Sequence, residues 1–289
     1  TAIDEVPDLG PEVLDRTLEG LSRGCDDLAD LGPEAHHAVF VRLHQLMIQR
    51  RADLIDLVQT EQGKPFHEAM QEFNGALQSV ETLAVDPSLI GPEIQPLAKE
   101  PSSRGWQGFT LREPHGIAGI LTPVTYPLLI PIIQVCYALA AGNAVLLKPA
   151  RTTPLIALRL VEMLLQAGLP PSAIACLPGP GKTLGAAICE DPRLNFLSCI
   201  GRIPTVKAVR NIAAFVPTQL QWGCVSSVIL DRSANLDQFV ASFVRASFDN
   251  AGQSAFTASW IAAADEIHDE VIERLEAAMK RISLGDPRN

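Results

Sequence analysis

The 289-residue chain is poor in aromatic residues, which make up 5% of it, and it contains no run of basic residues. Its 23 Lys and Arg residues are outnumbered by 33 Asp and Glu residues, so the formal net charge is −10 at pH 7. A nucleic acid partner would need a concentrated Lys/Arg surface, and the composition argues against one. The apolar content of 47% is enough to form a substantial core.

The six cysteines include no CxxC pair, and the histidines do not cluster at metal-ligand spacing. We therefore expect no metal site and no disulfide framework. Most of the thiols are expected to be small core residues of a reduced protein. The adjacent His36 and His37 suit a solvated helix surface better than a metal site.

No secretory signal is visible in the first ten residues, which are acidic and lack the basic and apolar regions of such a signal. The nearly uncharged stretch from Gly116 to Leu147 is longer than a membrane span. Pro123, Pro127 and Pro131 interrupt it, which favours strand, loop and buried helix over a spanning helix. We expect a cytoplasmic protein without a membrane partner.

Helical periodicity dominates residues 11–85, where Val39, Leu43 and Met47 recur at four-residue steps between polar residues. The segment Gln62–Pro65 breaks this pattern, and a second helix is expected after it. The Pro- and Ser-rich segment 86–104 is typical of a long connection and predicts an internal boundary.

From residue 106 onward, strands and helices alternate. Strands are predicted at 106–112 and 117–121 as a pair entering a sheet, and then at 144–147, 174–177, 194–200 and 225–230. Helices are predicted at 132–141, 154–167, 183–189 and 205–215, followed by two more at 236–247 and 267–282. This alternation predicts an α/β protein with a doubly wound, Rossmann-like parallel sheet, in which ligands bind at the carboxyl ends of the strands.

Two segments lie where such a sheet would bind a nucleotide. The glycine-rich segment Pro178–Gly185 follows a predicted strand and opens a predicted helix, although a plain strand-to-helix turn explains it equally well. Lys148 ends the buried strand of GNAVLLKPA, where its ammonium group would meet ribose hydroxyls or a phosphate. A solvated lysine at a strand end is the simpler alternative.

Four segments in order resemble the aldehyde dehydrogenase family: TPVTYP at 122–127, GNAVLLKPA at 142–150, PGPGKTLG at 178–185 and FDNAGQS at 248–254. The resemblance begins near residue 12 and is closer to the NAD(P)-dependent semialdehyde dehydrogenases than to acylating types. It implies an N-terminal helical region at 1–104, a Rossmann-like NAD(P)-binding domain at 105–232 and the incomplete start of a catalytic domain at 233–289.

The family's reaction uses a cysteine nucleophile, a glutamate base and an asparagine oxyanion donor. The resemblance places Ala255, Gln221 and Thr125 at these positions. Ala255 has no nucleophile and the neutral amide of Gln221 cannot accept a proton, so we expect the ordinary dehydrogenase reaction to be absent. Cys224, near the position of the glutamate, is a candidate displaced nucleophile, although a small residue packed in a turn is the better interpretation.

The resemblance also implies a cofactor site for NADP or NAD, with binding that is weak or lost. Its expected residues are Thr122, Pro123, Lys148, Arg151, Gly181, Gly185, Gly201 and Arg202. An acidic residue that would bind both ribose hydroxyls is replaced by Arg151, which favours NADP. Arg202 would either hold the pyrophosphate or fill the site.

These observations favour a non-catalytic aldehyde dehydrogenase homologue that binds a nucleotide or has a structural or regulatory role. An active oxidoreductase using Cys224, and a non-functional remnant, remain as alternatives. The segment Leu284–Pro287 resembles a point after which the family's catalytic domain continues, so we expect a longer protein, a homo-oligomer or a partner subunit to cover apolar surface. The ligand expected besides the cofactor is a small aldehyde or none.

Overall fold

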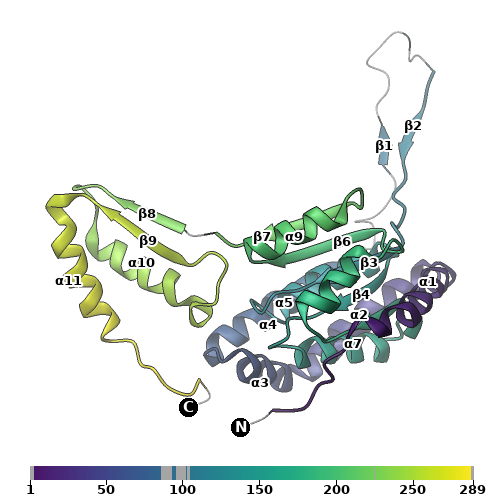
Figure 1. Ribbon diagram of the computed structural model, residues 1–289, viewed down its shortest axis with the longest axis horizontal. Coiled ribbons are helices and arrows are strands. Elements are labelled where there is room, and N and C mark those ends of the chain that lie inside the picture. The colour runs from purple at the N-terminus through teal and green to yellow at the C-terminus, as the bar shows by residue number, and fades with distance from the viewer. Residues whose placement is uncertain (1–2, 86–92, 96–101, 103–104, 225, 288–289) are drawn as a thin grey trace.

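The computed structural model describes residues 3–85, 93–95, 102, 105–224 and 226–287 (Figure 1). A short 3-10 turn, Pro11–Val13, leads into four helices: α1 (Leu14–Asp30), α2 (Pro33–Gln49), α3 (Arg51–Gln62) and α4 (Phe66–Val85). Gly63 ends α3 with a left-handed φ of 72°, a conformation that glycine adopts without strain. The helical N-terminal region and its break at 62–65 are confirmed.

Five parallel strands form the central sheet, in the spatial order β5-β4-β3-β6-β7. The strands are β3 (Ile117–Leu121), β4 (Ala144–Lys148), β5 (Ile174–Cys176), β6 (Phe196–Gly201) and β7 (Thr218–Trp222). The connections carry α5 (Leu129–Pro131), a π-helical turn (Ile132–Cys136), α6 (Tyr137–Ala140), α7 (Leu155–Gln166), a 3-10 turn (Pro171–Ala173), a second π-helical turn (Gly181–Gly185), α8 (Ala186–Glu190) and α9 (Ile203–Ala213). This order reverses between β3 and β6, as in a doubly wound sheet, so the predicted fold class is confirmed.

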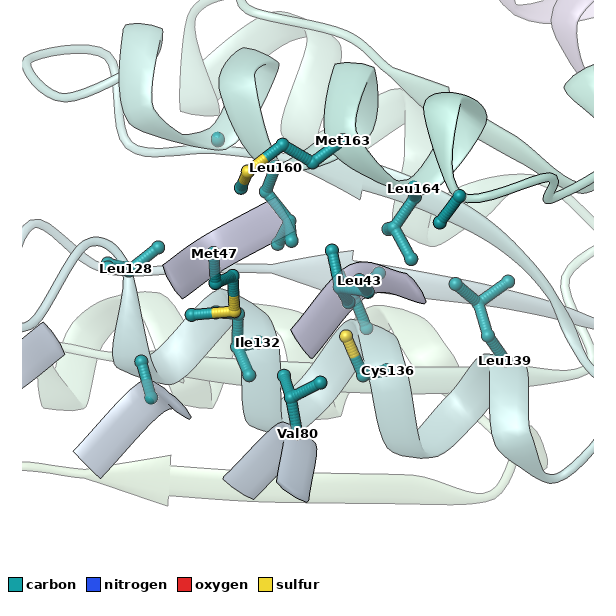
Figure 2. Close-up of a cluster of buried hydrophobic side chains, with 14 of the residues drawn as sticks. Leu43, Met47, Val80, Leu128, Ile132, Cys136, Leu139, Leu160, Met163 and Leu164 are labelled. Atoms are coloured by element: carbon teal, nitrogen blue, oxygen red, sulfur yellow. The ribbon is translucent and has the colours of Figure 1, made fainter. Parts of the chain in front are cut away.

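Both faces of the sheet are buried: the side chains of successive residues in β4 belong to two different apolar clusters, one on each face. Val145 and Leu147 pack in one apolar cluster with α2, α4 and α7, and Figure 2 shows part of this cluster around Leu43 and Ile132. Leu146 belongs to a second cluster on the opposite face, with α1, α8 and α9. A strand that is buried at every position, as β4 is, therefore suits a parallel sheet covered on both sides.

The prediction that residues 106–112 and 117–121 form a strand pair is wrong. Within the first range, β2 (Gly108–Thr110) pairs antiparallel with β1 (Glu93–Gln95) in a separate hairpin that projects away from the sheet (Figure 1). Gly116, with a φ of 119°, lies between β2 and the buried β3. Alternation of apolar and polar residues predicts a strand but not its partner. Most of the predicted connection 86–104 lies outside the described residues.

The strand predicted at 225–230 exists as β8 (Ser226–Leu230), but its predicted place in the central sheet is wrong, and Val225 lies outside the described residues. β8 pairs in parallel with β9 (Ala258–Ala263) in a second, two-stranded sheet. The fifth strand of the main sheet is β7, which the sequence did not predict. Its sequence TQLQW lies on the edge and is largely exposed, so it lacks the apolar run that marks the inner strands.

Two helices cover one face of the second sheet: α10 (Leu236–Phe248) and α11 (His268–Met279). Short 3-10 turns, Asp249–Gly252 and Asp265–Ile267, flank β9. Both helices were predicted, although α11 ends at Met279 rather than at Ile282. In the part of the chain that the structure describes, none of the helices has the length and apolar character to cross a membrane. The division at residues 104 and 232 stays a prediction.

Candidate functional site

The predicted cofactor residues follow neighbouring strands at the carboxyl edge of the central sheet. Leu121 and Lys148 are register partners in β3 and β4, and the Thr122 amide donates to the Lys148 carbonyl at 3.2 Å. Thr122 and Lys148 are buried, and Pro123 is half-buried. In open α/β sheets ligands bind at this edge, next to the point where the strand order reverses. The structure therefore brings these three residues together.

Lys148 is a buried cation, with 6% of its surface exposed. Its Nζ donates to the Pro149 carbonyl at 2.7 Å, and no other hydrogen bond of this ammonium is found among the described residues. Burial lowers the pKa of Lys148, and the nearby Cys176, Cys199 and Asp8 partly offset this effect. An ammonium group with unused donors in such a place suits an anionic or hydroxylated ligand.

The glycine-rich segment forms a π-helical turn at Gly181–Gly185, preceded by the extended residue Pro180. A side chain at Gly181 would meet open space, whereas one at Gly185 would lie 3.5 Å from the side chain of Lys148. The turn therefore lies beside the lysine side chain, and a Cβ at Gly185 would make only an ordinary van der Waals contact with it. A regular helix begins only after the turn, at α8, three residues later than predicted.

Arg151 is exposed and its Nη2 lies 2.8 Å from the carboxylate of Asp8. Asp8 belongs to the N-terminal segment, 143 residues away in the sequence. Sequence reasoning found Arg151 but missed Asp8, because neither spacing nor composition connects them.

Gly201 ends β6, and Arg202 is the exposed residue that immediately precedes α9. A side chain at Gly201 would touch only the Thr205 side chain, at 3.7 Å. The Arg202 backbone is extended and its side chain does not cap the helix. Both residues lie at the carboxyl edge of the sheet, but the structure shows no contact of Arg202 that fills the site, within the described ranges.

Two of the positions implied by the resemblance to aldehyde dehydrogenases, Ala255 and Cys224, are in contact where β7 leaves the sheet. The Cys224 amide donates to the Ala255 carbonyl at 3.3 Å. A Cβ built on Gly223 would lie 3.3 Å from the Ala255 methyl group, so the two residues are in contact. Gln221, two residues before Gly223, is exposed and pairs with Ile200 of β6. The loop that carries Ala255 therefore contacts Gly223 and Cys224, which follow Gln221 by two and three residues.

Thr125 joins the same site from the loop after β3. Its hydroxyl donates to the Gln253 carbonyl at 2.9 Å, two residues before Ala255. The hydroxyl is therefore occupied by the loop that carries Ala255. An asparagine at this position would have an amide with two N–H donors, whereas the threonine hydroxyl has one proton to donate.

Sequence reasoning missed the network that holds this loop. Lys64 is fully buried, pairs with the buried Glu72, and donates to Asn250 Oδ1 at 2.8 Å. Its ammonium also lies 5.1 Å from the centre of the Tyr126 ring. Gln253 Nε2 donates to the Gln62 carbonyl at 3.1 Å. The helical N-terminal region thus anchors the loop at 249–255.

Sequence signals for this network were weak. Gln62–Pro65 attracted notice only as a helix break, and nothing in the spacing marked Lys64 as buried. Glu72 lies within a regular helix, and its sequence position does not indicate that its carboxylate accepts from the Leu128 amide, at 2.7 Å. A buried cation is recognised only when the fold shows what surrounds it.

Histidines and cysteines form no group of three or more metal ligands, alone or with carboxylates, in the described ranges. All six cysteines are free, and Cys224 is exposed. The interpretation of His36 and His37 as a solvated surface is wrong. Both are half-buried, the His36 Nε2 atom is buried, and the His37 Nε2 atom lies 2.8 Å from the Ala84 carbonyl.

Curated relatives are similar in sequence to most of this chain. A 3-sulfolactaldehyde dehydrogenase of Priestia aryabhattai is 28% identical over 255 residues, covering 88% of this chain and 54% of the relative. Malonate-semialdehyde dehydrogenase 2 of Geobacillus kaustophilus is 30% identical over 251 residues, covering 86% of this chain and 51% of the relative. The chain therefore spans about half the length of these relatives.

Solved structures agree with the fold. The glyceraldehyde-3-phosphate dehydrogenase of Methanocaldococcus jannaschii, solved with NADP, superposes with a TM-score of 0.90 over 99% of this chain and 62% of its own, at 23% identity. A putative aldehyde dehydrogenase of Burkholderia cenocepacia reaches 0.85 over 96% and 58%, at 27% identity. The sequence model of the aldehyde dehydrogenase family matches residues 1–289, and the chain belongs to that family.

Proposed function

We propose that this chain binds NAD(P) but does not carry out the family's thiol-dependent oxidation of aldehydes. The observation that carries the proposal is the methyl group of Ala255, which lies against Gly223 where the nucleophile would be needed. A methyl group cannot attack a carbonyl carbon, so no covalent intermediate forms at this residue.

Two further replacements support the proposal. The amide of Gln221 is neutral and does not take a proton from water. The hydroxyl of Thr125 already donates to the Gln253 carbonyl, so it is not free to stabilise an oxyanion. Loss of one such donor lowers the rate by roughly 100- to 1000-fold, and loss of the nucleophile alone removes the covalent route.

The residues at the carboxyl edge of the sheet suit a bound dinucleotide, although the catalytic positions lack the groups for the family's reaction. The buried ammonium of Lys148 has donors available, and Gly185 of the glycine-rich turn lies beside the lysine side chain. Gly181 borders open space at the start of the glycine-rich turn. Lys148 would bind ribose hydroxyls, and the amides of the turn would face phosphate oxygens. A bound nicotinamide would supply a hydride acceptor.

The test is calorimetric titration of the purified chain with NADP and with NAD, followed by an assay of NAD(P)H formation with a panel of aldehydes. We expect saturable binding without turnover. Turnover with any aldehyde would overturn the non-catalytic half of the proposal, and absence of binding would overturn the other half. Lys148→Met serves as the matched variant, which should weaken binding while the protein stays folded.

A second candidate is an active oxidoreductase that uses Cys224. It is favoured by one contact, the hydrogen bond from the Cys224 amide to the Ala255 carbonyl. The Cys224 side chain is exposed and its Sγ lies 3.8 Å from the Ser226 hydroxyl. If this candidate is right, the wild-type chain turns over an aldehyde and Cys224→Ser does not.

Thiol alkylation separates the two candidates further. Burial raises the pKa of Cys136, Cys176 and Cys189 to about 12, so these thiols should stay unreactive at pH 8 in the folded protein. The exposed Cys224 should be alkylated. An aldehyde substrate that forms an adduct with Cys224 would protect it from alkylation, whereas the non-catalytic chain would show no protection.

A further inference from the structure

The N-terminal segment, residues 3–10, lies on the carboxyl edge of the sheet. The Leu9 amide donates to the Pro178 carbonyl at 3.0 Å, at the start of the glycine-rich turn. The Leu9 carbonyl approaches Gly179 so closely that a side chain there would collide with it. Leu9 is also half-buried against the apolar cluster below α1. The segment is thus fixed to the candidate cofactor site by its backbone and by one side chain.

This attachment brings a carboxylate to the end of β4. Asp8 lies 2.8 Å from Arg151 Nη2, and its charge is among those that act on the buried Lys148. Arg151 follows Lys148 by three residues, at the position where the resemblance implies that the side chain meets the ribose; an acidic group there favours NAD and an arginine favours NADP. The ion pair brings both kinds of side chain together, from two distant parts of the chain.

We propose that Asp8 sets the selectivity between NAD and NADP by competing with the 2′-phosphate for Arg151. This inference rests on the proposed binding of NAD(P). The carboxylate would accept hydrogen bonds from the ribose hydroxyls of NAD, whereas it would repel the 2′-phosphate of NADP. Asp8 thereby counteracts the preference for NADP that Arg151 alone would give.

The pair is accessible to a ligand. The side chains of Arg151 and Asp8 are 69% and 48% exposed, and exposed ion pairs contribute little stability. A 2′-phosphate can therefore displace the carboxylate, at a cost to affinity of about fivefold, which is the upper range for an exposed charge pair. Loss of the carboxylate as an acceptor from ribose should weaken NAD binding by about threefold.

The experiment measures dissociation constants of NADP and NAD for the wild-type chain and for Asp8→Asn, by calorimetry at low ionic strength. We expect Asp8→Asn to shift the ratio of the two constants about fifteenfold toward NADP, the combined effect of the lost competition for Arg151 and the lost acceptance from ribose. Asp4→Asn is the matched control, since it removes the same charge from the same segment and Asp4 bonds only to its neighbour Glu5 within the described residues. Its ratio should equal that of the wild type.

A double variant isolates the contact itself. In Arg151→Ala, NADP loses its partner, so the additional change Asp8→Asn should shift the ratio much less than it does in the wild-type background. Binding of both nucleotides with the same ratio in the wild type and in Asp8→Asn would refute the role of Asp8 and leave the proposed function intact. If neither nucleotide bound the wild-type chain, the proposed function would be refuted, and the inference with it.

Discussion

Lys64 shows at the scale of one residue how the helical region and the loop at 249–255 are joined. Its ammonium is fully buried and is satisfied by Glu72, Asn250 and the face of Tyr126. Glu72 in turn accepts from the Leu128 and Leu129 amides. A buried charge is tolerated only when its partners are in place, so each member of the network depends on the others.

Replacing Lys64 by Met should lower the free energy of unfolding by about 3–5 kcal/mol, because the carboxylate of Glu72 is left buried without its partner. Urea unfolding followed by circular dichroism measures this change. Lys280→Met is the control, since it breaks an exposed pair with Glu276 and should change stability by less than about 1 kcal/mol. Equal effects of the two substitutions would contradict the assignment of Lys64 as the anchor.

Another single residue, His36, should make the free energy of unfolding depend on pH. Burial lowers its pKa from the usual 6.5, against a smaller opposite effect of a backbone hydrogen bond with Leu139. The unfolded state therefore takes up the proton more readily than the folded state, and stability is lost as the pH falls below 6.5. In His36→Gln this loss should disappear.

The measurement is the free energy of unfolding from pH 7.5 down to pH 5, in the wild type and in His36→Gln. The wild type should lose stability relative to the variant over the acidic part of this range. His67→Gln removes a histidine that is 67% exposed and should leave the wild-type profile unchanged. A wild-type curve parallel to that of His36→Gln would show that His36 does not contribute.

Residues whose role depends on local sequence could be predicted, and those whose role depends on distant contacts could not. Lys148 was found because it ends a strand whose other four residues are apolar. Asp8 and Lys64 were missed because their partners lie 143 and 186 residues away, at Arg151 and Asn250. Periodicity and motif spacing carry no information on such pairs.

At the scale of elements, the inner strands, the edge strand β5 and the long helices followed from apolar patterning, whereas the opposite edge strand, β7, did not. β7 was not predicted, because an edge strand needs fewer apolar residues. β8 was assigned to the wrong sheet, because the apolar pattern of a strand does not determine which strand it pairs with. The π-helical turns at Ile132–Cys136 and Gly181–Gly185 have no signature in sequence periodicity.

The start of α7 depends on a cap from another helix. Pro154 precedes α7 and offers no side-chain cap, whereas Glu61 of α3 accepts from the Leu155 amide at 2.6 Å and the Ile156 amide at 2.9 Å. Glu61→Ala should destabilise the protein by about 1–2 kcal/mol, the usual effect of a lost helix cap. Thermal unfolding of the variant checks this.

Glu61→Gln refines that experiment. The amide oxygen still accepts one of the two N–H groups, so its effect on stability should be smaller than that of Glu61→Ala. Burial raises the pKa of Glu61, and its two amide donors lower it to a lesser degree. If both variants were as stable as the wild type, α7 would not need the cap.

On the scale of the whole molecule, the second sheet has one covered and one open face. Leu230 and Ile261 face α10 and α11, whereas Ile229 and Trp260 are 83% and 61% exposed on the opposite face. Exposed apolar patches of this kind associate with other surfaces. Relatives contain about as many residues again beyond the part matched here.

The double substitution Ile229→Thr and Trp260→Thr should reduce concentration-dependent self-association of this chain, because it removes apolar area from the open face. Sedimentation velocity over a range of concentrations measures it. Ile94→Thr, in the projecting hairpin, is the control for loss of an exposed isoleucine elsewhere. If the double variant still self-associated and Ile94→Thr did not, the contact would lie on the hairpin instead.

The anchors of the loop at 249–255 are Lys64, Gln62 and Thr125, none of which is the residue at position 255. The contacts that fix the shape of this loop therefore do not involve the side chain at position 255. The side chain at 255 can be exchanged without loss of these anchoring contacts. A nucleophile introduced at position 255 would be held in the same loop by the same three residues.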